Sequence, residues 1–468
     1  MADTRIRFAC FPSVVQAGKI AEITIFPADL SRRFSAEDEY EVGVIGLLDD
    51  MDSYYGAVPP NIDYRVERGC LKFTFFFRRE QEYQVSFCRK GEKRTKLALF
   101  AADEDLWRLR PLKGDFHSHS YYSDGDDGVA MTPVEYRKEG FDFFALTDHN
   151  RMYPSVYARE LFSGVKLGMH ILKGEEVHTP GSLLHIVHVG GESSVCEQYV
   201  RDGEGYRRAV DELEKTLPEV SENYRRRVAM ARWACGEIHK AGGIAILPHP
   251  YWKPYKYNVS DEFCHLLFAQ KMFDAFELVS GVGVECCNLQ LALWQEETLR
   301  GNGLPVLGNS DSHHHEPDRN EFGCKFSLVF AAANDTPSIL AAVRQGYCVA
   351  GELSGAQGGE VRFYGSRRLV TFANFLFRTY FGKTKELCAA EGKLMERFVE
   401  GEDVSGVLSA LADSVDTFYR RFYGLLPAPV IPPERMDWLD RLAQAQETSG
   451  VLTKGSNITL TPGRERRK

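Results

Sequence analysis

Residues 113–125 read Lys-Gly-Asp-Phe-His-Ser-His-Ser-Tyr-Tyr-Ser-Asp-Gly and contain two histidines, His117 and His119, separated by one residue. Residues two apart on a β-strand point to the same face, so both imidazoles can reach one metal ion. Asp124 adds a carboxylate on the turn that Gly125 completes. One His-x-His pair alone is weak evidence, because alternation by itself also places two histidines on one face of a sheet. The pair gains weight from similar residues that follow later strands.

Residues of the metal-binding types recur with later apolar runs, beyond residue 111. They are Asp148 and His149 after the run 141–147, Glu175 and Glu176 after 169–173, His249 after 243–248, and Asp311 and His313 after 304–310, while the run 183–189 itself contains His185 and His188. Helical stretches separate several of these runs, the longest at 206–240 with an expected break at Pro218. Repeated strand-then-helix units predict an α/β fold with a parallel sheet. The carboxyl ends of its strands would meet on one side, where a closed barrel carries its active site.

The recurring residues indicate a metal site. They offer nitrogen and oxygen ligands and no cysteine, which suits Zn, Mn or Fe without selecting one of them. A single histidine such as His249 is more often a packed loop residue than a ligand. Six strand ends with the same few residue types are hard to explain in that way, so we expect them to converge.

Three parts are expected in the chain, because 468 residues are too many for one ordinary core. Residues 1–110 hold β-type runs at 21–26, 41–45, 71–77 and 82–87, which predict a sandwich-like accessory domain, with a ligand-binding module as the alternative. Residues 111–350 are expected to form the barrel. Residues 351–468 are expected to add aromatic-rich helices at 372–398 and 404–423, then a proline-rich linker and a polar, mobile tail at 463–468.

Composition is that of an ordinary soluble globular protein, with 44% hydrophobic and 26% charged residues. A net charge of −9 argues against a surface built for bulk nucleic-acid or membrane binding. The eleven cysteines are scattered and never spaced Cys-x-x-Cys, so we expect reduced core cysteines and a cytoplasmic location. The N-terminus lacks a long apolar segment, and no run reaches the ~18 apolar residues of a membrane span.

The ordered motifs resemble those of the PHP superfamily (polymerase and histidinol phosphatase). They are His117-x-His119, Ser123-Asp124-Gly125, Thr147-Asp148-His149, Gly174-x-Glu176, His185, His249-Pro250 and Asp311-x-His313. The stretches 114–119 and 147–150 are similar to the carbaryl-hydrolase-like branch of that superfamily. The resemblance covers residues 111–350 and neither flanking region. It is specific for the fold and the metal site, and much less specific for the substrate.

The resemblance implies a distorted (β/α)7 barrel that holds two or three divalent metal ions. It implies His117, His119, Glu176 and Asp311 at the first ion, Glu176, His185 and His249 at the second, and Asp124, His149 and His313 at the third. Some relatives carry histidine in place of Asp124, so the third position stays open. Asp148 either ligates or orients His149. His188 competes with His185, which is favoured because residue 188 would face the other side of a regular strand.

Metal-dependent hydrolysis is the activity that the resemblance implies. Two close cations lower the pKa of a water molecule and supply hydroxide at neutral pH, so no serine or cysteine nucleophile is needed. The leaving group would take its proton from His313 or from water. We expect a phosphoesterase acting on a small phosphate ester or nucleotide, because several metals suit the spread charge of phosphoryl transfer. Arg151, Lys253 or Lys256 would then grip the phosphate.

Two other functions stay open. Phosphatases of the superfamily often carry arginine just after the His-Pro pair, whereas Tyr251 and Trp252 follow His249-Pro250 here. These rings suit an aromatic substrate, which makes a carboxylic or carbamic ester or amide hydrolase the alternative. An inactive scaffold is the third reading, and the apparently complete ligand set argues against it. The sequence does not predict the oligomeric state.

Overall fold

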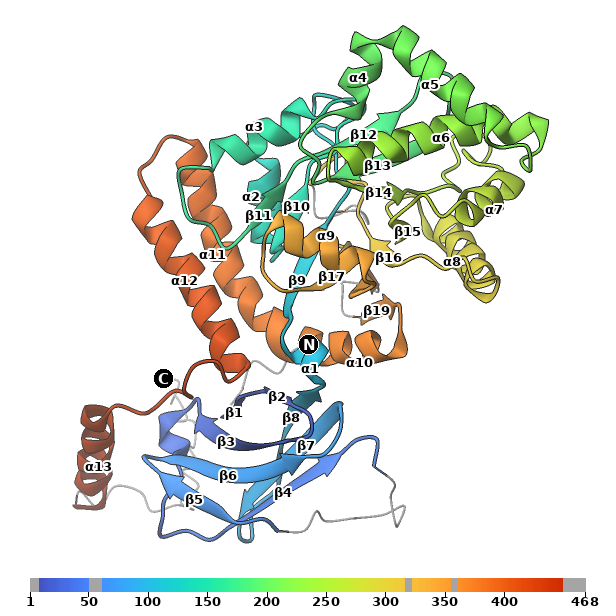
Figure 1. Cartoon of the computed structure of the whole chain (residues 1–468). Coiled ribbons are helices and arrows are strands. Elements are labelled where there is room, and N and C mark those ends of the chain that lie inside the picture. The colour runs from blue at the N-terminus through green and yellow to red at the C-terminus, as the bar shows by residue number, and fades with distance from the viewer. Residues whose placement is uncertain (1–7, 50–60, 316–321, 355–359, 449–468) are drawn as a thin grey trace, which may run out of the picture.

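The computed structural model describes residues 8–49, 61–315, 322–354 and 360–448 of the chain. Figure 1 shows a part built of strands at the bottom, a mixed α/β part at the top, and C-terminal helices beside them. The tail at 463–468, for which the sequence predicts mobility, lies outside the described residues. Within the described ranges, no helix combines the length and apolar character needed to cross a membrane.

The first part consists of two four-stranded sheets. One has the order β1 (Phe8–Phe11), β3 (Lys19–Pro27), β6 (Cys70–Phe77), β5 (Tyr64–Glu67), and the other the order β2 (Val14–Gln16), β8 (Thr95–Ala102), β7 (Gln81–Arg89), β4 (Tyr40–Gly46). Apolar side chains from both sheets form one core, among them Ile23, Phe73 and Val85. The four β-type runs expected from the sequence lie in β3, β4, β6 and β7. The helix α1 (Glu104–Trp107) then leads into the second part.

Two further sheets make up the mixed part. The first has the order β11 (His170–Leu172), β10 (Phe143–Ala145), β9 (Arg110–Asp115), β17 (Lys325–Ala331), β18 (Cys348–Ser354), β19 (Glu360–Tyr364). The second has the order β12 (Gly174–His178), β13 (His185–Val189), β14 (Ile244–Leu247), β15 (Ala275–Val279), β16 (Val306–Gly308). Both contribute to one apolar core, which includes Leu112 and Phe143 of the first sheet and Val187 and Ile246 of the second.

Two isolated β-bridges connect the sheets near the ends of their strands. Ser118 after β9 pairs with Ser312 after β16, and His149 after β10 pairs with Glu176 in β12. All of these residues lie in or next to the motifs that the sequence singles out. The bridges therefore draw the loops that carry the predicted ligands into one region of the fold.

The expectation of a parallel sheet is wrong for β13, which runs antiparallel to both of its neighbours, β12 and β14. The reason is the short connection between β12 and β13, residues 179–184. A parallel crossover needs about a dozen or more residues, so this connection can join only antiparallel strands. The strands β17, β18 and β19 are also paired antiparallel.

Helices flank the two sheets of the mixed part (Figure 1). They are α2 (Thr132–Lys138), α3 (Tyr153–Leu161), α4 (Val195–Arg201), α5 (Gly203–Lys215), α6 (Glu222–Lys240), α7 (Asp261–Ala269), α8 (Val284–Leu299) and α9 (Thr336–Arg344). The break expected at Pro218 is present between α5 and α6, because proline has no N–H for the helical ladder. All eleven cysteines are unpaired, and all except Cys324 are buried, as the sequence predicts.

The C-terminal helices join the other two parts. They are α10 (Arg367–Leu376), a π-helical turn (Phe377–Phe381), α11 (Gly382–Val399), α12 (Ser405–Phe422) and α13 (Pro433–Thr448). The two helical stretches expected from the sequence are confirmed, whereas β19 and α13 are not predicted by it. In α11, Glu391 forms a fully buried ion pair of 2.6 Å with Arg137 of α2. At the C-terminal end of α12, the Phe422 carbonyl accepts a hydrogen bond of 2.8 Å from the Ser13 N–H, which connects α12 to the β part.

Candidate metal centre

The loop after β9 is held against the loop after β16 by backbone hydrogen bonds. The Asp311 N–H donates to the His117 carbonyl at 3.0 Å, and the His119 N–H donates to the Ser312 carbonyl at 2.8 Å. Asp115 at the end of β9 is fully buried and accepts from the Ser310 and His117 N–H groups, each at 3.1 Å. Two strands far apart in sequence thus place His117, His119 and Asp311 side by side.

Glu176 lies at the centre of the predicted site and is fully buried. Its two oxygens have five imidazoles within 3.4 Å: His149 Nδ1 at 2.7 Å, His185 Nδ1 at 2.8 Å, His249 Nε2 at 3.3 Å, and His117 Nε2 and His119 Nε2 at 3.4 Å each. A sixth, His178 Nε2, lies 4.0 Å away. Among the described residues, neither oxygen has a partner with hydrogen-bond geometry. Buried polar atoms are normally satisfied, so atoms that crowd together without hydrogen bonds indicate a shared partner of another kind.

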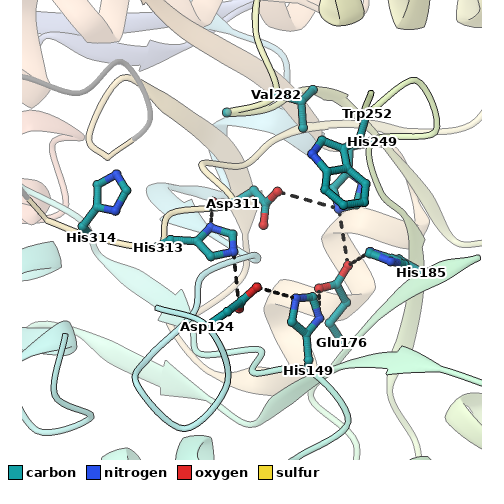
Figure 2. A pocket seen from close by; sticks show the side chains of 11 residues that line it. Asp124, His149, Glu176, His185, His249, Trp252, Val282, Asp311, His313 and His314 are labelled. Atoms are coloured by element: carbon teal, nitrogen blue, oxygen red, sulfur yellow. Dashed lines mark hydrogen bonds and ion pairs between the residues drawn. The ribbon is translucent and has the colours of Figure 1, made fainter. Parts of the chain in front are cut away.

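Asp311 and Asp124 extend this cluster on two sides (Figure 2). Asp311 Oδ1 lies 3.0 Å from His119 Nε2 and 3.2 Å from His117 Nε2. Asp124 lies 3.3 Å from His149 Nε2 and 3.4 Å from His313 Nε2. Several of these side chains form overlapping groups, and within each group the potential ligand atoms lie within 4.8 Å of one another: His117 with His119 and Glu176; Glu176 with His185 and His249; and His119 with Asp124, His149 and His313. The structure therefore brings together all nine residues predicted as ligands.

Two imidazoles form a hydrogen bond through the ring nitrogen that points away from the cluster, and this bond fixes which nitrogen carries the hydrogen. His117 Nδ1 lies 2.9 Å from the Glu277 carboxylate, and His313 Nδ1 lies 2.8 Å from the Asp311 carbonyl oxygen. Both partners can only accept, so in each neutral ring Nδ1 carries the hydrogen and Nε2 keeps its lone pair. In both residues the Nε2 atom faces the carboxylates of the cluster. This is the arrangement that a metal-ligating histidine needs.

Opposite charges in the cluster stabilise one another. Burial lowers the pKa of His149, but the nearby negative charges of Asp124 and Glu176 outweigh burial and raise it to about 10. The same balance, with Asp124 and Asp311 as partners, raises the pKa of His313 to about 9. His149 and His313 in turn hold the pKa of Asp124 well below its usual range. The carboxylates thus attract positive charge into a buried site, which is favourable for binding a cation.

His185 and His188 lie on opposite faces of β13. His185 Nδ1 faces Glu176, whereas His188 Nδ1 lies 3.0 Å from Glu175 on the other side of the sheet. Two predicted ligands do not follow a strand: Glu176, expected just after the run 169–173, lies within β12, and His185 is the first residue of β13. Because β13 runs antiparallel to its neighbours, its beginning lies where the other strands end.

The other residues with a predicted role are not part of the cluster of predicted ligands. Asp148 is fully buried and accepts from the Ser120 N–H at 2.8 Å and the Ser123 hydroxyl at 2.6 Å, so it shapes the loop that leads to Asp124. Arg151 is exposed. Lys253 lies 3.8 Å from Glu285, and Lys256 is exposed. This arrangement gives no support to a phosphate-binding role for the three cations.

Two residues of the site were not singled out by the sequence analysis. Glu277 lies inside the apolar run of β15, where a lone carboxylate in a fully buried strand is the signal that could have found it. His178 stacks on His185 with ring centroids 3.8 Å apart. It follows Glu176 by two positions in β12, so strand alternation places both on the same face.

The cluster lines a cavity of ≈ 290 Å³, shown in Figure 2. Its lining consists of Asp124, His149, Glu176, His185, His249, Trp252, Gly281, Val282, Asp311, His313 and His314. The nitrogen and oxygen atoms converge on its floor, and Trp252 and Val282 stand to one side (Figure 2). A small molecule can therefore reach the predicted ligands from outside.

Comparison with known proteins gives matches only among solved structures. No family model matches the chain, and no curated protein matches it. A two-domain protein of Bacteroides vulgatus, described as containing a predicted PHP-like metal-dependent phosphoesterase, is 20% identical over 52% of this chain, with a TM-score of 0.37. A Bifidobacterium adolescentis protein described as a metal-dependent phosphoesterase is 19% identical over 44% of this chain, with a TM-score of 0.32. An amidohydrolase of Chromobacterium violaceum, solved with bound sulfate and no metal, is 20% identical over 43%, with a TM-score of 0.29.

The matched region spans 65% of the first of these chains, 89% of the second and 87% of the third. By their descriptions, these three solved structures are thus a protein containing a predicted PHP-like metal-dependent phosphoesterase, a metal-dependent phosphoesterase and an amidohydrolase. These sequence identities and TM-scores are too low to assign an activity to this chain. Its function has to be inferred from the side chains of the site.

Proposed function

We propose that the chain is a metal-dependent hydrolase of the PHP superfamily, with a distorted (β/α)7 barrel formed by the two sheets of the mixed part. The observation that carries the proposal is the crowding of five imidazoles around the buried carboxylate of Glu176, without hydrogen bonds among the described residues to satisfy its oxygens. A structural salt bridge needs one partner for such a carboxylate, whereas a carboxylate shared by two metal ions needs ligands on both of its sides.

The residues fit two or three divalent transition-metal ions of the Zn, Mn or Fe type. We assign His117, His119, Glu176 and Asp311 to the first ion, Glu176, His185 and His249 to the second, and Asp124, His149 and His313 to the third. Support comes from the overlapping groups of ligand atoms and from the outward-facing Nδ1 atoms of His117 and His313. Asp311 is assigned from its distances of 3.0 Å to His119 and 3.2 Å to His117. The set contains only nitrogen and oxygen donors, which suits these metals.

When bound, such ions lower the pKa of a water molecule and polarise the group that it attacks. The protein's own contribution is positioning. Glu277 holds the proton of His117 on Nδ1, and Asp148 holds the loop that leads to Asp124 through Ser120 and Ser123. When the third position holds no ion, His313 is the candidate for protonating the leaving group, because it lines the cavity and is 29% exposed at its side chain.

A small phosphate ester or nucleotide is the first proposed substrate class, because several cations in one site suit the spread charge of phosphoryl transfer. A carboxylic or carbamic ester or amide of an aryl group is the second. The observation that favours the second is the cavity lining, which within the described residues includes Trp252 and no lysine or arginine.

Turnover of a substrate panel by the metal-reconstituted full chain tests the proposal. The panel holds phosphomonoesters, phosphodiesters and aryl esters, each assayed before and after removal of metal with a chelator. The proposal predicts metal-dependent hydrolysis of at least one class, fastest for a phosphate ester. Hydrolysis of aryl esters alone would select the second class. No turnover of any of them by protein that carries its metals would reject the hydrolase.

A further inference from the structure

One wall of the cavity is apolar and has no part in the predicted ligand set. It consists of Trp252, Gly281 and Val282, and Figure 2 shows His314 on the opposite side. Residue Trp252 is 39% exposed, although its ring centroid lies only 5.9 Å from the His185 ring and 6.3 Å from the His249 ring. A large aromatic face is therefore open to the cavity directly beside the floor where reaction is proposed.

The loop that carries Trp252 is firmly held. The Trp252 N–H donates to the His249 carbonyl at 3.0 Å, and the Trp252 carbonyl accepts from the Asn258 N–H at 2.9 Å. The preceding Tyr251 is buried and donates its hydroxyl to Asp261 at 2.7 Å. The indole is thus presented by a fixed backbone, which lowers the cost of ordering it around a ligand.

The lysine next to this wall, Lys253, points away from the cavity toward other side chains. Lys253 Nζ lies 5.4 Å from the centroid of the Tyr257 ring and 3.8 Å from Glu285, and it does not line the cavity. His314 on the opposite side has Asp126 at 3.8 Å. A second anionic group on a substrate would therefore meet no lysine or arginine among the described lining residues, and burying it without a partner is costly.

We propose that Trp252 and Val282 form a subsite for a planar, uncharged group of the substrate, so that the preferred substrates are esters of an aryl or similar ring. This inference rests on the proposed function, because the reacting group has to lie at the predicted metal ligands. The cavity volume of ≈ 290 Å³ agrees with a small ligand of this kind. It lies at the lower end of ligand pockets, which span roughly 300–1,000 Å³.

Calorimetric titration with phenylphosphonate and methylphosphonate tests the subsite. The two compounds share a charged head group, differ in the ring, and are not esters that could be hydrolysed. We expect the metal-reconstituted protein to bind phenylphosphonate about ten-fold more tightly than methylphosphonate. Trp252→Ala should abolish this preference without changing the affinity for methylphosphonate, and Trp252→Phe should keep most of it.

Tyr255→Ala is the matched control, since Tyr255 belongs to the same loop, is 98% exposed and does not line the cavity. It should leave both affinities unchanged. Metal content is measured for every variant, so that damage to the neighbouring histidines is detected separately from loss of the ring.

Equal binding of the two phosphonates by the unmodified protein would overturn the subsite, as would an undiminished preference in Trp252→Ala. Binding of neither compound by metal-loaded protein would instead reject the phosphoester as substrate. The comparison is then made with the neutral pair phenyl acetate and ethyl acetate. A fall in the ratio of the two kcat/KM values in Trp252→Ala, relative to the unmodified protein, upholds the subsite, and an unchanged ratio overturns it, because the intrinsic difference between the two leaving groups is the same for both proteins.

Discussion

Glu176→Gln and Glu175→Gln make the same chemical change at adjacent positions, and the structure predicts opposite consequences. Successive residues of a strand point to opposite faces, so in β12 the Glu176 side chain faces the cluster and the Glu175 side chain faces away from it. Both side chains are fully buried, so the comparison is not confounded by exposure. Each substitution removes one charge and keeps the volume of the side chain.

At Glu176 the lost charge is the one that two metal ions are proposed to share. Removing one partner from a buried, compensated set of charges costs about 3–5 kcal/mol. That corresponds to roughly 10²- to 10⁴-fold weaker metal binding. We therefore expect Glu176→Gln to lose metal and to lose turnover with it. The fold should persist, because the core of the two sheets is not touched.

At Glu175 the lost charge is one that stabilises the folded chain through hydrogen bonds. Its oxygens accept from the Ser194 hydroxyl at 2.6 Å, the Val195 N–H at 2.7 Å and His188 Nδ1 at 3.0 Å. The glutamine amide turns one acceptor into a donor, which faces another donor. Hydrogen bonds to a charged group contribute about 1.5–3 kcal/mol each, so Glu175→Gln should lower the free energy of unfolding by about that amount. Metal content and turnover of the folded protein should stay close to those of the unmodified chain.

Two measurements on both variants show which glutamate is the bridging carboxylate. They are metal per chain by elemental analysis after reconstitution, and urea denaturation followed by circular dichroism. We expect Glu176→Gln to be poor in metal and folded, and Glu175→Gln to be rich in metal and less stable. The reverse pattern, with metal lost from Glu175→Gln and retained by Glu176→Gln, would refute the placement of the bridging carboxylate.

Further predictions concern two buried carboxylates outside the ligand set. Glu277→Gln should weaken metal binding about 10- to 100-fold in a competition titration, because the His117 Nδ1 hydrogen loses its charged acceptor; unchanged affinity would show that Glu277 does not orient the ring. Glu391→Gln should lower the free energy of unfolding by up to about 3–5 kcal/mol, because the buried Arg137 guanidinium loses its closer charged partner and keeps only Asp142 at 3.4 Å. Glu402→Gln, at an exposed ion pair, is the control for urea denaturation and should leave stability unchanged; an equal loss in both variants would contradict the role of burial.

The sequence predicts much of the site because strand ends bring distant residues together. Residues as far apart as His117 and Asp311 are joined by one bridge between strand ends, and alternation within a strand separates Glu176 from Glu175. Both effects follow from the backbone alone. The direction of a strand does not follow from alternation or from strand ends. His185 lies at the start of β13 because the connection from β12 is too short for a parallel crossover.

Other features depend on tertiary packing that local sequence does not reveal. Glu277 lies in an apolar run, and only the positions of His117 and Asn309 show that its carboxylate has partners at 2.9 Å. The strand β19 pairs with β18 across a glycine-containing segment that resembles a loop in the sequence. The helix α13 begins at Pro433, within the proline-rich stretch 427–433 for which the sequence predicts a linker, although proline is well suited to the first turn of a helix.

Metal binding by this cluster can be measured as the metal content of the purified full chain. The protein is stripped with a chelator, reconstituted with Zn, Mn or Fe, freed of loosely bound metal, and analysed for metal per chain alongside circular dichroism. We expect at least two ions per chain, and a parallel loss of metal in His117→Ala and Asp311→Ala variants that remain folded. Fewer than one ion per chain in the folded, reconstituted protein would contradict this expectation.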